Sequence, residues 1–105
     1  LILHSKSFIH DINGGEYYYR LGRVTDALKN YKDALEYYEM AIVKGDPDKY
    51  YGCSASLYAG LIYEEQKKFT KARQYFDKCL SLYPEGYSAS LHQKAKSGLN
   101  RIGNK

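Results

Sequence analysis

The residues that most often do chemistry in proteins are scattered along this chain. Histidines stand at His4, His10 and His92, without an HExxH pattern and without a carboxylate at metal-ligand spacing. The adjacent carboxylates Glu64 and Glu65 would point apart on a helix. Hydrolysis and metal catalysis need such groups to converge. The sequence therefore predicts no enzyme, no metal site and no bound cofactor.

Two cysteines, Cys53 and Cys79, could hold a metal or form a disulfide. They make no CxxC pattern, and no histidine cluster lies near either, so a zinc site is not expected. We interpret them as free thiols that pack as small apolar side chains, with a disulfide as the alternative. Because both states fit, the cysteines identify no cellular compartment.

A basic run, "KKFTKAR" at residues 67–73, could contact phosphate groups. However, Phe69 within the run is expected in the core, and the lysines fall between two predicted helices. Charged side chains in such turns usually face water. We interpret the run as a solvated turn and do not expect nucleic-acid binding, because affinity for nucleic acid scales with the number of phosphates neutralised.

Overall composition limits the remaining possibilities. A chain of 105 residues can form one small domain with a modest core. Sixteen Lys or Arg against twelve Asp or Glu give a net charge of +4, and residues 67–105 carry nine of the basic residues. No apolar run approaches the roughly 20 residues of a membrane span. The chain starts without Met and has no signal-peptide pattern, so we expect it to be part of a longer protein.

An internal repeat is the strongest pattern in the sequence. Shifting the chain by 38 residues aligns small residues with small ones and large apolar residues with large ones. The aligned pairs are Gly22 with Gly60, Val24 with Ile62, Tyr31 with Phe69, Ala34 with Ala72, Tyr37 with Tyr75, Tyr38 with Phe76, Ala41 with Cys79 and Ile42 with Leu80. The sequence therefore contains two copies of one supersecondary unit.

Each unit is predicted to be a pair of antiparallel helices. In residues 31–42 the apolar side chains recur at spacings of one and three, which places them on one helix face. "KN" at 29–30 and "KK" at 67–68 interrupt this pattern and indicate a short turn. Small residues such as Gly22 and Ala34 would let the two helix axes approach closely, which explains a glycine inside a helix.

Tetratricopeptide repeats (TPRs) are the family that this unit resembles. The resemblance rests on "YYYRLGRVTDALKNYKDALEYYEMAI" and "LYAGLIYEEQKKFTKARQYFDKCLSLYP", and it covers roughly residues 15 to 86. The matching positions are Leu21, Gly22, Tyr31, Ala34, Tyr38 and Ala41 in the first copy, and Gly60, Tyr63, Phe69, Ala72, Phe76 and Pro84 in the second. Thr25, Ala59 and Cys79 depart from the family pattern. The resemblance implies an all-α, TPR-like α-solenoid of two antiparallel helical hairpins.

The 38-residue period is longer than the roughly 34 residues of a TPR unit. We place the extra turn around "KGDPDKYYG" at residues 44–52. Asp46 is the expected N-cap, Pro47 suits the first helical position, and Asp48 favours the positively charged helix start. The third helix is therefore predicted to run from Pro47 to about Gln66.

The sequence predicts one domain over residues 1–105, with repeats at 15–46 and 47–84. In residues 85–102 an amphipathic pattern predicts a C-terminal capping helix, with His92 expected to face water. Its apolar residues are Leu91, Ala95, Gly98, Leu99 and Ile102, and its outer residues are Lys94, Lys96 and Arg101. Residues 1–12, before Asn13-Gly14-Gly15, are predicted to form an N-terminal helix stub from a preceding unit. The ending "KCLSLYPEGYSASLHQKAKSGLNRI" also resembles the C-terminal ends of Bacteroidetes-type TPR proteins.

The TPR resemblance implies a concave groove lined by the first helices of successive units, where a protein or peptide binds. The residues expected there are Tyr19, Arg23 and Asp26 from the first unit and Leu57, Leu61 and Glu64 from the second. For the two leucines, packing against neighbouring helices is the alternative. The groove would suit an amphipathic helix or an extended peptide. It does not resemble the chaperone-tail clamp of some TPR proteins, which has Lys and Asn where Tyr19 and Arg23 stand.

The predicted function is that of a protein- or peptide-binding scaffold or adaptor. Two alternatives stay open: a structural or self-associating end of a longer TPR solenoid, and a regulatory appendage of an enzyme or DNA-binding protein. The sequence names no partner, no pathway and no compartment, although it slightly favours the cytoplasm.

Overall fold

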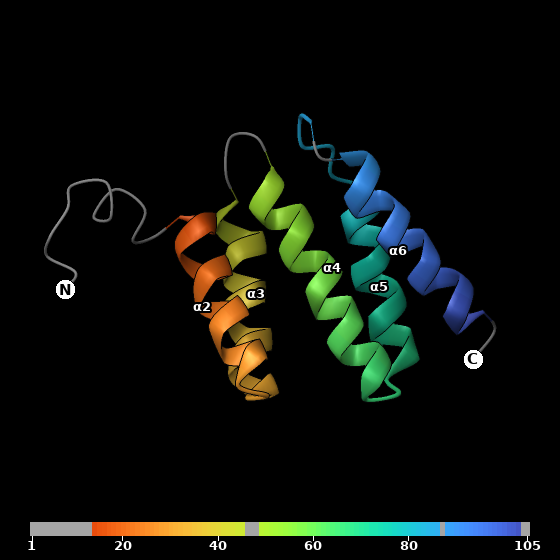
Figure 1. Cartoon of the computed structure of the whole chain (residues 1–105), viewed down its shortest axis with the longest axis horizontal. Helices are drawn as coiled ribbons and strands as arrows, with labels where there is room; N and C mark the ends of the chain where they lie inside the picture. Colours follow the sequence, from red (N-terminus) through yellow and green to blue (C-terminus); the bar gives the residue numbers. More distant parts are fainter. Residues whose placement is uncertain (1–13, 46–48, 87, 104–105) are drawn as a thin grey trace, which may run out of the picture.

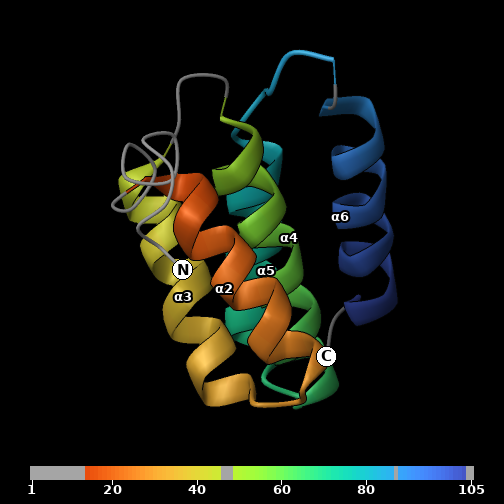
Figure 2. The same cartoon turned by 60° about the vertical axis from the view of Figure 1, so that its left-hand side comes forward.

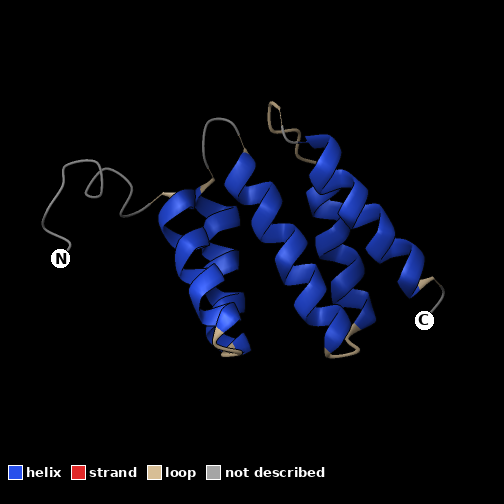
Figure 3. Ribbon diagram, viewed as in Figure 1, coloured by secondary structure: helices blue, strands red, loops and turns tan. Residues whose placement is uncertain are grey.

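The computed structural model describes residues 14–45, 49–86 and 88–103. Over these residues the chain forms five helices and no strand (Figure 3). The helices are α2 (Gly15–Ala27), α3 (Tyr31–Lys44), α4 (Tyr50–Glu65), α5 (Phe69–Leu80) and α6 (Ser88–Ile102). The predicted all-α fold is confirmed. The predicted stub at residues 1–12, which contains His4 and His10, lies outside the described residues.

The helices form two layers. In Figure 1, α2, α4 and α6 lie side by side in the nearer layer, and α3 and α5 lie behind them. Figure 2 shows α4 and α5 between the α2–α3 hairpin and α6. The first helices of both hairpins, α2 and α4, therefore lie in one layer together with α6, as expected for stacked helical hairpins.

The turns inside the two hairpins repeat the same backbone conformation. Lys29 and Lys67, 38 residues apart, have φ angles of 64° and 63°, in the left-handed region. Their amides donate to the carbonyls of Asp26 and Glu64, both at 2.9 Å. Left-handed backbone cannot continue a right-handed helix, so each first helix ends here. The predicted turns are confirmed.

The start of α4 differs from the prediction. Helix α4 begins at Tyr50, not at Pro47, and Lys49 before it has a φ angle of 63°. A residue with this φ lies outside a right-handed helix, so the helix cannot run continuously from Pro47. Residues 46–48 lie outside the described residues. The predicted C-terminal end near Gln66 agrees with the observed last residue, Glu65, to within one position.

Glycine–aromatic contacts hold the helices together at equivalent positions of each unit. A Cβ atom added at Gly22 would lie 2.5 Å from the ring of Tyr38, and one at Gly60 would lie 2.7 Å from the ring of Phe76. A third such contact follows 38 residues later, where a Cβ at Gly98 would lie 2.5 Å from Phe76. Helix α6 therefore takes the place of a third first helix. Ala34, Ala72 and Pro84, which also belong to the repeat pattern, are buried.

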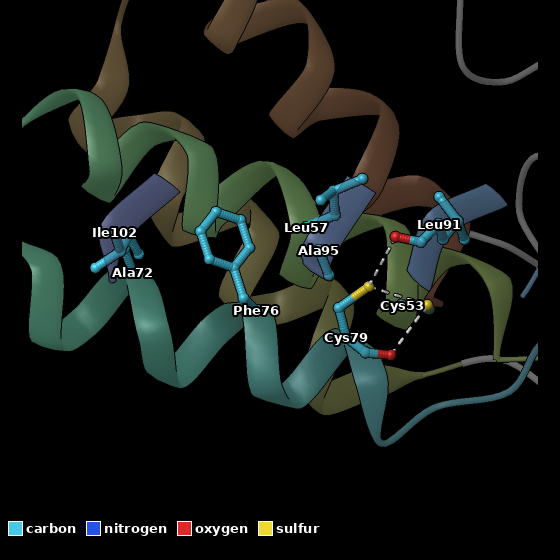
Figure 4. Packing of buried hydrophobic residues seen from close by; sticks show 8 residues of the cluster. All are labelled: Cys53, Leu57, Ala72, Phe76, Cys79, Leu91, Ala95 and Ile102. Carbon is cyan, nitrogen blue, oxygen red and sulfur yellow. Dashed lines mark hydrogen bonds between the residues drawn. The ribbon is translucent and has the colours of Figure 1, made fainter. Parts of the chain in front are cut away.

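Phe76 is the largest side chain of the core under α6. Figure 4 shows it among Leu57, Leu91, Ala95 and Ile102, which come from α4 and α6. Because α6 contributes three of these apolar side chains, it closes the core at this end of the stack.

Cys53 and Cys79 lie at one end of the same core. Both are buried and form no disulfide, and their Sγ atoms are 3.5 Å apart, so the interpretation as packed thiols holds. The contact with Cys53, together with burial, raises the pKa of the Cys79 thiol. A neutral thiol is the form that fits such an apolar site.

His92 does not simply face water, as the sequence pattern suggested. Its Nε2 atom lies 2.6 Å from the carbonyl oxygen of Leu82, and its ring meets that of Tyr83 at a centroid distance of 4.8 Å. Since a carbonyl oxygen only accepts, Nε2 donates this hydrogen bond. His92 thus ties α6 to the loop after α5.

Candidate functional site

Tyr19 on α2 is the centre of a tyrosine cluster between the first two hairpins. The neighbouring rings, with centroids 5.4 to 6.4 Å from that of Tyr19, are Tyr38, Tyr50, Tyr51 and Tyr58. Ser54 Oγ donates a 3.0 Å hydrogen bond to Tyr19 Oη. Burial raises the pKa of the Tyr19 hydroxyl, although the bond from Ser54 acts in the opposite direction. Tyr19 therefore contributes to packing as well as to surface.

Arg23 connects this cluster to a polar network. Its guanidinium carbon lies 3.8 Å from the ring centroid of Tyr58, and Nη1 donates to Tyr38 Oη at 3.2 Å and to Asp26 Oδ2 at 3.4 Å. The hydroxyl of Tyr38 in turn donates to Asp26 Oδ2 at 2.8 Å. The contact with the ring and the two hydrogen bonds together hold the guanidinium in place, yet 42% of the Arg23 side chain stays accessible.

The three residues predicted on α4 lie in different environments. Leu57 is 0% exposed and packs against Phe76, so the prediction that it faces the groove is wrong, and the packing alternative applies. The reason is that α6 covers this side of α4. Leu61 is half-buried at the edge of the same core. Glu64 accepts two hydrogen bonds from Arg101 on α6, both at 2.8 Å.

Apart from the buried Leu57, the structure divides the predicted residues into two groups. Tyr19, Arg23 and Asp26 on α2 belong to the cluster formed with α3 and α4, whereas Leu61 and Glu64 lie where α4 meets α6. Sequence reasoning missed Tyr58 and Arg101, which complete the two groups. Tyr58 shares helical spacing with Ser54 and Leu61, so periodicity could have proposed it. The pairing of Arg101 with Glu64, 37 residues away, has no local sequence signal.

The charged side chains of the two groups neutralise one another. The charges occur in internal pairs, Arg23 with Asp26 and Glu64 with Arg101. Among the described residues, no group of three or more His, Cys, Asp or Glu side chains could hold a metal ion. Over the same part of the chain, no helix is long and apolar enough to cross a membrane.

Comparison with known proteins identifies the repeat. A family model described as tetratricopeptide repeat matches residues 12–85, well over half of the chain. The chain belongs to the tetratricopeptide repeat family. The TPR match ends before α6, whose role as a third first helix comes from Gly98 and its contact with Phe76. Searches of the curated proteins and of the solved structures gave no significant match. TPR modules typically serve as scaffolds for protein interaction, and this general role follows for the present chain.

Proposed function

We propose that this TPR protein binds a protein or peptide partner on the layer formed by its first helices. The surface is defined by Tyr19, Arg23, Tyr58, Leu61 and Glu64 and is called the first-helix face. The observation that supports it best is the guanidinium of Arg23, whose central carbon lies 3.8 Å from the ring centroid of Tyr58 while 42% of the Arg23 side chain is accessible.

This arrangement suits an amphipathic helix or an extended peptide. Tyrosine and arginine are the residue types that most often supply binding energy at interfaces, and here both are already ordered. Ordering before binding lowers the entropy cost of association. Asp26 balances part of the charge of Arg23 at 3.4 Å. Apolar groups of the partner would therefore supply most of the affinity, and a carboxylate near Arg23 would orient it.

Affinity purification with the intact protein, followed by measurement of each recovered partner, tests this function. Arg23→Gln is the site variant, because Gln removes the charge and the stacking contact without disturbing Tyr19. Lys96→Gln on α6 is the matched control, since it removes the same charge from an exposed position. We expect a loss of about tenfold in affinity, equivalent to about 1.4 kcal/mol, for Arg23→Gln alone.

Melting curves of both variants must show that each is fully folded at the temperature of the binding assay. A partner that binds wild type, Arg23→Gln and Lys96→Gln equally well would place the interaction elsewhere and refute the first-helix face.

A second candidate function is stacking on another helical unit. Val24 and Leu28 on the outer side of α2 are 58% and 73% exposed, whereas Ile62, equivalent to Val24, is 4% exposed beneath α3. A helix packed on α2, as α3 packs on α4, would bury Val24 and Leu28. Light scattering over a range of concentrations tests whether a second copy provides that helix, because self-association raises the mean mass with concentration.

A further inference from the structure

The second layer contains a cleft between α3 and α5 that the first-helix face does not use. Tyr75 on α5 reaches across it and donates a 2.6 Å hydrogen bond to Glu39 on α3. Tyr63 on α4 stacks on Tyr75, with ring centroids 5.4 Å apart, and forms part of the floor. The hydrogen-bonded pair of Tyr75 and Glu39 therefore divides the cleft into two parts.

The part of the cleft toward the C-terminal end of α3 has a basic rim. It encloses about 420 Å³, and its lining includes Lys71 and Lys78 together with Ile42 and Val43. It adjoins a second hollow of about 490 Å³ that shares Ile42 and Lys78 with it. The lysines Lys44 and Lys49 border this second hollow. We call the combined surface the basic cleft; its residues are Ile42, Val43, Lys44, Lys49, Lys71 and Lys78.

The described residues of the basic cleft carry four lysines and one carboxylate, that of Glu39, which accepts the bond from Tyr75. In the part of the chain that the structure describes, no acidic side chain forms an ion pair with Lys44, Lys49 or Lys78. This contrasts with the first-helix face, where each charge has a partner. A ligand with carboxylates would find matching charge here.

Two aliphatic side chains line the cleft together with these lysines. Val43 is 67% exposed, one of the few exposed large apolar side chains among the described residues, and Ile42 beside it is half-buried. We propose that the basic cleft binds an acidic amphipathic segment of a partner protein. Its apolar side chains would cover Ile42 and Val43, and its carboxylates would meet the lysines. Apolar anchors supply the energy of such a contact, and rim charges select and orient the segment.

A protein segment fits this surface better than a nucleic acid. Nucleic-acid sites combine a track of basic residues with aromatic rings on which bases stack. Here the lysines surround aliphatic groups, Glu39 lies in the floor, and the ring of Tyr75 is occupied by Tyr63.

Fluorescence anisotropy with a defined probe tests the proposal. The probe is a labelled peptide of about 15 residues, which spans about 22 Å as a helix, with Leu at every third or fourth position and Glu at the others. The site variant is Lys71→Gln with Lys78→Gln, and the matched control is Lys94→Gln with Lys96→Gln on α6. Both pairs remove two exposed charges. A third variant, Val43→Ser, removes the exposed apolar anchor without emptying a core position.

We expect the peptide to bind the wild type, with a dissociation constant about tenfold higher for the site variant and changed by less than about twofold for the control. Val43→Ser should weaken binding severalfold, and added salt should weaken it further, since rim charges are screened. No saturable binding, or equal losses in both double variants, would overturn the proposal. Tighter binding of a single-stranded DNA of equal charge, unaffected by Val43→Ser, would identify a nucleic-acid surface instead.

Discussion

The two repeats carry the same pattern but are used differently. Tyr38 in the first and Phe76 in the second hold equivalent positions, and both are fully buried. Around Phe76 the neighbours are apolar or glycine, including Gly60 and Gly98 on either side. Around the hydroxyl of Tyr38 they are polar, with Asp26 and Arg23 in hydrogen-bond contact.

The cause of this difference is the number of neighbours in the stack. The second repeat has α3 on one side and α6 on the other, whereas in the described residues the first repeat has a neighbour only at α4. Val24 is consequently exposed, and its equivalent Ile62 is buried. The repeat pattern fixes the contacts inside a hairpin, and the position in the stack decides which outer positions become core.

Removing α6 should lower the free energy of unfolding most, because it would leave the second repeat, like the first, with a neighbour on one side only. Deletion of residues 87–105 uncovers Phe76 and takes away Leu91 and Ile102. Each large apolar side chain contributes about 1.5–3 kcal/mol when fully buried, and small domains are stable by only about 5–15 kcal/mol. We expect this deletion to cost more stability than deletion of residues 1–12. Urea denaturation followed by circular dichroism measures both, and the opposite order would contradict the role assigned to α6.

Enlarging the alanine at the contact inside each hairpin should have the next largest effect. Ala34 and Ala72 are both 0% exposed, so a leucine there must push the helices apart. Overpacking of this kind costs about 1–3 kcal/mol. Because the contact belongs to the hairpin and not to the stack, Ala34→Leu and Ala72→Leu should lower the free energy of unfolding by similar amounts. If neither variant unfolds at lower denaturant than the wild type, the equivalence of the repeats is wrong.

Tyr38→Phe tests the polar network that only the first repeat has. Loss of the hydroxyl breaks its bonds with Asp26 and Arg23, which should cost about 1 kcal/mol at neutral pH. Phe76 has no hydroxyl group. Phe76→Leu, which replaces a buried ring by a smaller aliphatic side chain, therefore reports only on packing. A variant as stable as the wild type would show that the network adds nothing to folding.

Tyr38 should also make the free energy of unfolding depend on pH. Burial raises the pKa of Tyr38 above its usual value of 10.0. The folded state therefore holds this proton more tightly than the unfolded state, and the resulting stability is complete below about pH 10 and is lost as pH rises further. Denaturation curves between about pH 9 and 11 should show a shallower decline for Tyr38→Phe than for the wild type. Equal slopes would indicate that the hydroxyl titrates normally.

Leu28→Lys on the outer side of α2 should have the smallest effect. Leu28 is 73% exposed, so the substitution should change the free energy of unfolding by no more than about 0.5 kcal/mol. If the wild type self-associates through this side, its mean mass in light scattering should fall toward that of a monomer in the variant. A large loss of stability in a monomeric sample would mean that Leu28 is covered within one chain.

The sequence alone determined the elements and the contacts within each unit. The 38-residue shift predicted both hairpins, because the spacing of apolar residues defines a helix face without reference to the rest of the fold. It also located the turns at Lys29 and Lys67 and the close approaches at Gly22 and Gly60. These features depend on local geometry and on residue size, which a single sequence displays directly.

Only the tertiary structure decided which faces are buried and which charges meet. Periodicity placed Leu57 and Leu61 on one side of α4. It could not show that α6 packs on this side and buries Leu57, because that depends on where the last helix lies. The pairing of Glu64 with Arg101 and the close approach of Cys53 to Cys79 join residues 37 and 26 positions apart. The start of α4 at Tyr50 also departed from local signals, since Lys49 takes a left-handed conformation that no capping pattern indicated. Such features depend on how whole hairpins pack, because the energy of burial is shared among elements that are distant in the chain.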